Sequence, residues 1–250
     1  MRSRIPRDHP RYQSLVTRER MKDAFERGLI HATGLIAQGR GEAFDYLLGE
    51  GSAAYAKKAA GAAAAALLSA RQAVLSCNGN VVALAAKECV DAGRATGARL
   101  EVNLFHRTEP RVRRLVKELE KAGGRSVLGP RPDARIPGLL SDRAKCHIEG
   151  IFGADVVLVP LEDGDRAQAL ARMKKTVIAI DLNPLSRTAV AANITIVDEV
   201  RRALRLIAKA ARAYRHRGAT QATLRTAASR WDNAAALRRA RQAIAKRLRA

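Results

Sequence analysis

Two uninterrupted apolar runs, residues 156–159 and 177–180, constrain the fold of this 250-residue chain more than any other feature. Both are rich in Val or Ile and shorter than an ordinary helix, so each predicts a β-strand. A strand that is apolar on both faces is buried on both faces, as in a parallel sheet covered by helices on each side. The two runs therefore predict a three-layer α/β domain with a mostly parallel sheet.

The alternation of strands and helices continues along the chain. We predict strands at residues 74–77, 100–105, 126–128, 155–160, 176–181 and 194–197, and helices at 12–28, 52–71, 81–96, 111–122, 165–174 and 199–217. One or two more helices are expected within residues 217–250, whereas three glycines within residues 34–41 predict an irregular segment. We expect one domain, with a helical part at 1–72, the sheet core at 73–200 and basic helices at 201–250.

The positive charge is large and unevenly distributed. The formal net charge is +22, and residues 201–250 hold fifteen Lys and Arg against one acid, Asp232. Such a surface attracts polyanions, although the solvated helix faces of an arginine-rich protein have the same composition. Aromatic residues make up 4% of the chain, and residues 201–250 contain only Tyr214 and Trp231, too few for a base-stacking platform. We therefore expect no nucleic-acid partner.

The start of the chain and the cysteines favour a cytoplasmic location without a membrane anchor. The first residues lack a hydrophobic signal core, and no apolar run approaches the ~20 residues that span a bilayer. Cys77, Cys89 and Cys146 have no metal-ligand spacing, and their odd number favours reduced thiols. Cys77 lies at the end of a predicted strand, where we interpret it as a small buried residue rather than a nucleophile.

Polar segments follow four of the six predicted strands. They are residues 78–80, 106–109, 161–166 and 181–187. In an open parallel sheet, ligands bind beyond the carboxyl ends of the strands. The four segments therefore predict one ligand site at that end of the sheet.

Each segment has both a structural and a functional interpretation. Asn78 either caps the following helix or helps the positive helix end to hold an anion. Glu162 and Asp163 either bind Mg²⁺ or a substrate ammonium, or belong with Asp165 to a helix cap. Residues 181–188 either grip the ribose and phosphates of a nucleotide or form a proline-stiffened loop.

One arginine lies in a setting suited to phosphate. Arg40 stands between Gly39 and Gly41, where the backbone leaves its side chain room to reach an anion. The segment lacks the spacing of a phosphate-binding loop and the dinucleotide fingerprint. The five histidines are scattered, so they offer no metal site.

Together these motifs resemble those of the archaeal phosphopantothenate synthetases, the 4-phosphopantoate–β-alanine ligases. The similar segments, in order along the chain, are residues 34–46, 77–80, 100–109, 155–166 and 181–187. The similarity runs from residues 9–12 to residues 194–198, and more weakly to residues 231–233. It therefore covers nearly the whole chain.

The resemblance implies a Rossmann-like homodimer that joins 4-phosphopantoate to β-alanine, using ATP and Mg²⁺ and releasing AMP and diphosphate. It implies a phosphopantoyl-adenylate intermediate. It places the ATP contacts on Arg18, Arg40, Asp181, Leu182, Asn183, Arg187, Thr188, Glu199 and Val200. Of these, Arg40, Asn183 and Arg187 are expected to act in catalysis. Thr188 and Glu199 stand where relatives are expected to carry Ser and Asn.

Position and chemistry suggest the remaining assignments. We expect Arg107, with Asn78 and Asn80, to bind 4-phosphopantoate. Glu162 or Asp163 would bind Mg²⁺ or the β-alanine ammonium, and Arg166 in the same segment is also expected to contact substrate. Two alternatives stay open: a ligase acting on another acid such as pantoate, and a nucleic-acid-binding protein that uses the basic C-terminal helices.

Overall fold

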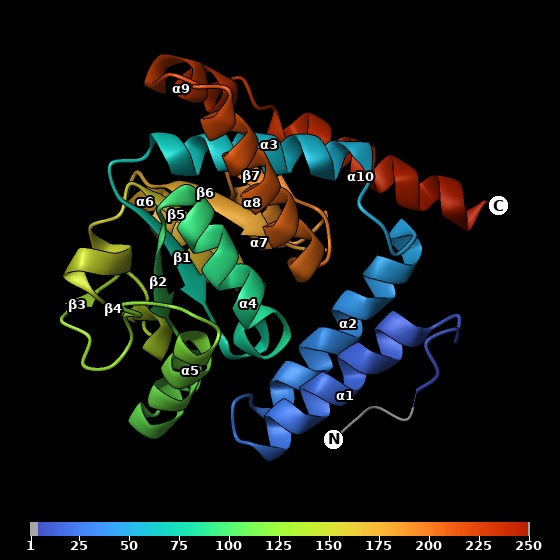
Figure 1. The fold of residues 1–250 in the computed structure, drawn as a ribbon, viewed down its shortest axis with the longest axis horizontal. Coiled ribbons are helices and arrows are strands. Elements are labelled where there is room, and N and C mark those ends of the chain that lie inside the picture. Colours follow the sequence, from blue (N-terminus) through green and yellow to red (C-terminus); the bar gives the residue numbers. More distant parts are fainter. Residues whose placement is uncertain (1–4, 250) are drawn as a thin grey trace.

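A five-stranded parallel sheet forms the centre of the protein. In the computed structural model, which describes residues 5–249, the strand order is β2-β1-β5-β6-β7 (Figure 1). The strands are β1 (Ala73–Cys77), β2 (Arg99–Val102), β5 (Val156–Pro160), β6 (Thr176–Ile180) and β7 (Ile194–Ile196), and each neighbouring pair is parallel. The predicted three-layer, Rossmann-like α/β fold is confirmed. Residues 1–4, on which the expectation about a signal segment partly rests, lie outside the described range, as does residue 250.

The apolar runs are buried on both faces, as their composition predicts. In β5, Val156 and Leu158 belong to the core on one side of the sheet, and Val157 and Val159 to the core on the other. Alternate residues of a strand point to opposite faces, so an uninterrupted apolar run fills both cores at once. β5 pairs with β6 along its full length, from Val156 opposite Thr176 to Pro160 opposite Ile180.

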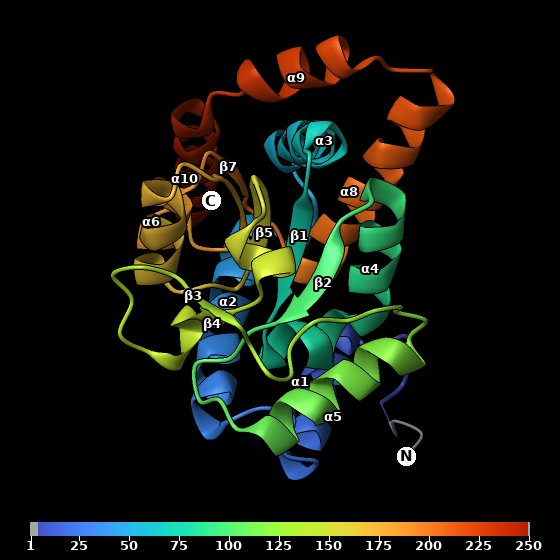
Figure 2. The same cartoon turned by 90° about the vertical axis from the view of Figure 1, so that its left-hand side faces the viewer.

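Helices cover both faces of the sheet (Figure 2). The first core is closed by α3 (Ala54–Ser69), α4 (Gly79–Thr96), α5 (Glu109–Lys121) and α8 (Val200–His216), and the second mainly by α6 (Gly164–Arg172). The short α7 (Arg187–Ala191) lies between α6 and the sheet edge, where α10 (Asn233–Leu248) packs, while α9 (Gln221–Ser229) crosses α3. All six helices predicted by residue range are thus confirmed to within a few residues. Within residues 5–249, no helix combines the length and apolar character needed to cross a membrane.

One predicted strand is wrong and another is too long. Residues 126–128 form no strand, because Ser126 adopts a left-handed backbone conformation with φ of 51°. Only Leu128 reaches the sheet, where it lies beside Glu101 and accepts a hydrogen bond from Val102 N at 2.8 Å. The predicted strand 100–105 ends at Val102. A small hairpin, β3 (Ala134–Arg135) with β4 (Lys145–Cys146), and two short turns, η1 (Asp142–Ala144) and η2 (Ile148–Phe152), occupy the long connection before β5.

The predicted irregular segment at residues 34–41 is also wrong. It lies inside α2 (Ala32–Leu48), which packs beside α1 (Tyr12–Glu26) beyond the carboxyl end of the sheet (Figure 1). His31 caps the helix by accepting a hydrogen bond from Thr33 N, and Gly49 ends it at φ of 93°. Internal glycines each cost a helix about 1 kcal/mol, and packing against α1, α4 and α10 offsets that cost. Arg40 therefore lies on a helix and not in a loop.

Candidate functional site

A cleft of about 350 Å³ lies between α2 and the carboxyl ends of the strands. Seven of the residues predicted for the site line it: Arg40, Asn78, Asn80, Asp163, Leu182, Glu199 and Val200. They come from α2, from the turn after β1, from the ends of β5 and β6, and from the start of α8. The fold therefore gathers five segments of the sequence at the end of the sheet where the strand-end rule places a ligand.

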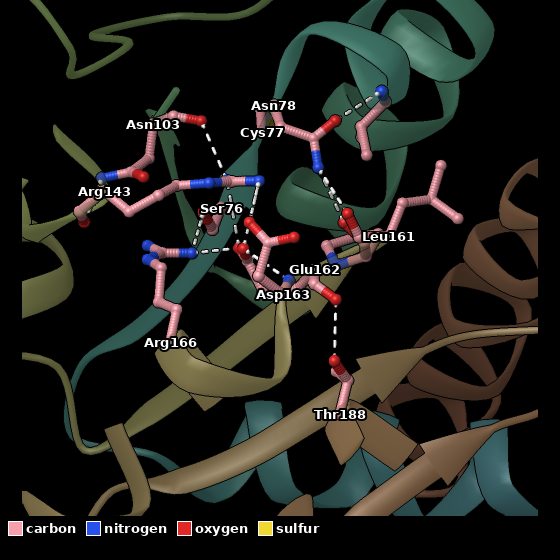
Figure 3. A network of polar contacts seen from close by, with 12 residues as sticks. Ser76, Cys77, Asn78, Asn103, Arg143, Leu161, Glu162, Asp163, Arg166 and Thr188 are labelled. Atoms are coloured by element: carbon pink, nitrogen blue, oxygen red, sulfur yellow. Dashed lines mark hydrogen bonds and ion pairs between the residues drawn. The ribbon is translucent and has the colours of Figure 1, made fainter. Parts of the chain in front are cut away.

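Asn78 performs the structural role that its position allows. Its Oδ1 accepts a hydrogen bond from Val81 N at 3.0 Å, which caps α4. Its Nδ2 donates to Pro160 O at 3.1 Å and to Leu161 O at 2.9 Å (Figure 3). Asn78 thus ties the ends of β1 and β5 together, and its side-chain amide is already occupied on both atoms.

Asn80 connects the start of α4 to α2. Its Nδ2 donates to Gly34 O at 2.8 Å. A Cβ atom at Gly34 would collide with Asn80 Oδ1, so only glycine allows this close approach. The glycine that argues against a helix in the sequence therefore positions one wall of the cleft.

Glu162 lies beneath the cleft in a buried ionic cluster (Figure 3). Its carboxylate forms ion pairs with Arg143, at 3.1 Å between Oε1 and Nη2, and with Arg166, and it also accepts a hydrogen bond from Asp163 N. Burial alone would raise the pKa of Glu162, but the charges of Arg143 and Arg166 lower it below its usual value. The side chain is 1% exposed, so its oxygens are enclosed by protein donors.

Asp163 is the carboxylate of this segment that faces the cleft. Its side chain is 54% exposed and its Oδ2 lies 3.3 Å from Arg143 Nη2. The protein around the carboxyl still removes part of its water, and this partial burial raises the pKa of Asp163, against the lowering effect of the Arg143 charge. It remains available to a metal ion or an ammonium group.

The segment after β6 forms a compact turn. Asp181 accepts hydrogen bonds from Ser186 Oγ and, at 2.9 Å, from Asn183 N, and Asn183 Oδ1 accepts one from Leu185 N at 2.9 Å. Burial raises the pKa of Asp181, while the nearby Arg40 charge lowers it. A Cβ atom at Gly41, the residue after Arg40, would lie 3.6 Å from Leu182 Cδ1, so α2 passes beside this turn.

Two of the predicted nucleotide residues line the cleft at the start of α8. Glu199 caps the helix by accepting a hydrogen bond from Arg202 N at 3.2 Å, and it pairs with Arg201 Nε at 3.1 Å. Val200 is the first residue of α8, where backbone N–H groups have no intrahelical acceptor. A helix start of this kind favours an anion such as a phosphate.

The other predicted residues lie outside the cleft lining. Thr188 is buried and donates to Glu162 O at 2.7 Å, whereas Arg187 is 67% exposed and pairs with Asp165 at 2.8 Å. Arg107 is 5% exposed and donates to Gly129 O, and Arg166 is fully buried. In the structure, these side chains therefore contact other protein groups with the atoms that were predicted to bind ligands.

Arg18 lies on the far side of α2 from the cleft. Its Nη2 forms an ion pair with Glu42 at 2.9 Å. Both residues line a second, shallower groove between α1 and α2, together with Met21, Tyr46 and Leu47. Arg18 is therefore separated, within one chain, from the other predicted ATP contacts.

The sequence did not reveal four basic residues of the cleft: His31, His106, Arg111 and Arg143. The rings of His31 and His106 lie 4.1 Å apart between centroids. His106 belongs to a polar segment noted after β2, so its position was a usable signal. Arg143 lies in the long connection before β5, and nothing in its local sequence points to the site.

Comparison with known proteins identifies the family. Residues 55–247 match the family described as phosphopantothenate/pantothenate synthetase. The chain belongs to this family. A relative from Methanosarcina mazei, named 4-phosphopantoate–β-alanine ligase, is 55% identical over 205 residues, which cover 82% of this chain and 81% of the relative. Proteins of the same name from Thermococcus onnurineus and Thermococcus kodakarensis are each 54% identical over 80% of this chain and 77% of their own length.

For a member of this synthetase family, the cleft offers few metal ligands of its own. Among residues 5–249, no group of three or more His, Cys, Asp or Glu side chains is arranged to hold a metal ion. Two described acidic residues line the cleft, Asp163 and Glu199. The Asp163 side chain is the more exposed of the two. Mg²⁺ is commonly held by one or two carboxylates together with substrate phosphates, and this donor set fits such an ion carried by a nucleotide.

Proposed function

We propose that this chain is an ATP-dependent ligase that condenses 4-phosphopantoate with β-alanine to 4′-phosphopantothenate, a step of coenzyme A biosynthesis. The observation that carries the proposal is the cleft itself, where the predicted nucleotide residues Arg40, Leu182, Glu199 and Val200 line one wall. Membership of the family and the names of its relatives support the choice of acid and amine.

The nucleotide binds at the β6 and α8 end of the cleft. Asp181 and Asn183 present a carboxylate and an amide at the end of β6, suited to ribose hydroxyls. Arg40 from α2 and the first turn of α8 bind phosphate oxygens. Arg187, which is exposed at the start of α7, can exchange its pairing with Asp165 for a phosphate.

The reaction has two steps. A carboxylate oxygen of the acid attacks the α-phosphorus of ATP, the bond to the β-phosphate bridging oxygen breaks, and diphosphate leaves. The amine nitrogen of β-alanine, having lost its extra proton, then attacks the acyl carbon. AMP leaves with the former carboxylate oxygen, and the nitrogen loses a second proton to solvent as the amide forms. Arg40 and Arg187 would stabilise the charge that develops on the phosphates, and Asn183 would orient the nucleotide. Mg²⁺ would neutralise phosphate charge when bound.

The β-alanine subsite lies near Asp163. An exposed carboxylate at the cleft wall attracts the substrate ammonium. Glu162 is enclosed by arginines and holds Arg143 in place, so Asp163 is the better candidate for either the ammonium or Mg²⁺. Asn80 borders the same part of the cleft.

The enzyme is proposed to act as a homodimer through the outer faces of α1 and α2. No residue of α2 is buried, although the helix is largely apolar. Ile36 is 67% exposed, Tyr46 64% and Phe25, on α1, 43%. An apolar face of this kind on adjacent helices is typical of an interface, and a second copy supplies a complementary apolar surface.

The test supplies ATP, Mg²⁺ and β-alanine with either 4-phosphopantoate or pantoate, and follows AMP and diphosphate. We expect both products with 4-phosphopantoate. Formation of ADP would contradict the adenylate route. Equal use of the two acids would contradict the substrate assignment, and salt-sensitive nucleic-acid binding without any ligation would favour the alternative class.

A further inference from the structure

Arg111 is fixed in place with one edge of its guanidinium unoccupied. It lies near the start of α5, where Nε donates to Leu29 O at 3.0 Å and Nη1 donates to His106 O at 2.8 Å. Within residues 5–249 it forms no ion pair with a carboxylate. Two backbone carbonyls thus orient the group, and its charge is left for something else in the cleft.

Arg143 reaches the same region from η1, in the long connection before β5. Its backbone is fixed by Asn103, whose Nδ2 donates to Arg143 O at 3.2 Å, and its guanidinium by Glu162 (Figure 3). The side chain is 7% exposed, and its Nε is buried without a hydrogen-bond partner. Burial, and then the charge of Arg143, lower the pKa of Arg111, because the two cations lie close together. Holding two such groups together is costly unless an anion joins them.

Two guanidinium groups, on Arg111 and Arg143, line this end of the cleft beside one carboxylate, that of Asp163. Arg166 is fully buried and pairs with Glu162. The first turn of α4 adds the positive end of a helix dipole. A Cβ atom at Gly79 would lie 2.8 Å from Arg111 Nη2, so this guanidinium rests directly against that turn. An anion with several oxygen atoms would fill the site.

This basic region is distinct from the nucleotide end of the cleft. Leu104, Phe105 and His106 bring it to the end of β2, whereas Leu182 follows β6. In the order β2-β1-β5-β6, three strand spacings separate the two ends, or about 14 Å at ~4.8 Å per spacing. That separation leaves room for an acid whose carboxylate meets the nucleotide while its other end reaches Arg111.

We propose that Arg111, Arg143 and the first turn of α4 bind the phosphate ester of the acid substrate and so select the phosphorylated acid. The proposal rests on the proposed ligase function. It replaces Arg107, whose side chain is taken up by Glu109 and Gly129 O. A phosphate of ATP has the same chemistry, so the test must separate the two sources.

The test compares Arg111→Gln with Arg113→Gln, an exposed arginine on the same helix outside the cleft. We expect Arg111→Gln to raise the KM for 4-phosphopantoate about 10- to 100-fold, the loss expected for hydrogen bonds to a charged group. The KM for ATP and for β-alanine should stay within twofold, and the preference for 4-phosphopantoate over pantoate should fall by the same factor. Arg111→Lys should recover part of the loss, and Arg113→Gln should match the wild type.

A second measurement does not depend on ligation. Inorganic phosphate, titrated calorimetrically, should bind the wild type and Arg113→Gln but not Arg111→Gln, with thermal unfolding confirming that each variant is folded. If the wild type shows this binding pattern but catalyses no ligation, the proposed ligase function is wrong and the phosphate site is still supported. An unchanged KM for 4-phosphopantoate, or a change confined to the KM for ATP, would overturn the assignment.

Discussion

Arg143 Nη2 lies 3.1 Å from Glu162 Oε1, and the two side chains are 7% and 1% exposed. Arg166 joins the same carboxylate and donates to Ser76 Oγ at 3.1 Å. The pair connects the long segment before β5 to the end of β5 itself, directly beneath the cleft. A single buried carboxylate therefore holds two arginines, one of which lines the site.

Glu162→Gln should destabilise the protein strongly. It leaves the buried Arg166 without its ion-pair partner and Arg143 with only the exposed Asp163, and breaking a buried pair in this way costs about 3–5 kcal/mol. Urea unfolding at neutral pH measures the change. Asp91→Asn is the matched control, since it breaks the exposed pair with Arg212, and a surface pair contributes about 0–1 kcal/mol. Equal losses in the two variants would show that the buried cluster contributes nothing special.

The contribution of Glu162 should also depend on pH. The charges of Arg143 and Arg166 lower its pKa in the folded protein, so its stabilising effect is fully present above the unfolded value of about 4.3. The effect is lost as the pH falls through the lowered folded pKa. The difference in unfolding free energy between wild type and Glu162→Gln should therefore shrink below about pH 4. A difference that stays constant from neutral pH into acid would refute the assigned direction.

Gly34→Ala should reduce activity by displacing α2 from α4. The added Cβ would collide with Asn80 Oδ1, so the hydrogen bond from Asn80 to Gly34 O must break or shift. Kinetic assays should show at least a tenfold loss in kcat/KM, the equivalent of about 1.4 kcal/mol. Gly61→Ala, in α3, meets nothing within 4 Å and should keep full activity with slightly higher stability. Full activity in Gly34→Ala would show that this contact does not shape the cleft.

The fold was predictable because its strongest signals are local. Alternate residues of the run 156–159 belong to the two cores, and the uninterrupted apolar composition of the run predicts this burial on both faces. α2 was missed because its stability comes from packing, whereas its glycines argue for an irregular segment. The strand predicted at residues 126–128 is wrong because a pattern of apolar residues does not reveal the left-handed backbone conformation of Ser126.

The sequence predicted residues of the site only where they directly follow a strand. The turn after β6 and Asp163 face or border the cleft as their positions suggest. Arg107 and Arg111 could not be told apart from sequence, because the start of α5 decides which of them turns toward Gly79. Arg143 comes from the long connection before β5 and is held at the site by Glu162, a contact between residues 19 apart that no local pattern predicts.

None of the three thiols should react in the folded protein. Cys77, Cys89 and Cys146 are all buried and free. Burial, with the Glu101 charge, raises the pKa of Cys146 to about 12, so the thiolate is scarce at pH 8. A colorimetric thiol reagent should titrate three groups in denaturant and none without it. Rapid reaction of one native thiol would contradict the assignment of the cysteines as packing residues. The experiment does not test the cytoplasmic location, which stays a prediction.

We predict that, in the proposed homodimer, Arg18 contacts the ATP bound by the partner subunit. Within its own chain it lies on the far side of α2 from the cleft, paired with Glu42, whereas Arg40 lines the cleft directly. Arg18→Gln and Arg40→Gln should each lower kcat/KM for ATP. When equal amounts of the two variants are mixed and allowed to exchange subunits, half of the dimers carry one site with both arginines, so activity should rise toward about one quarter of the wild-type value. Arg20→Gln on α1 serves as a control and should stay active. No recovery on mixing, with subunit exchange verified, would place Arg18 and Arg40 in the same subunit's site or remove Arg18 from it.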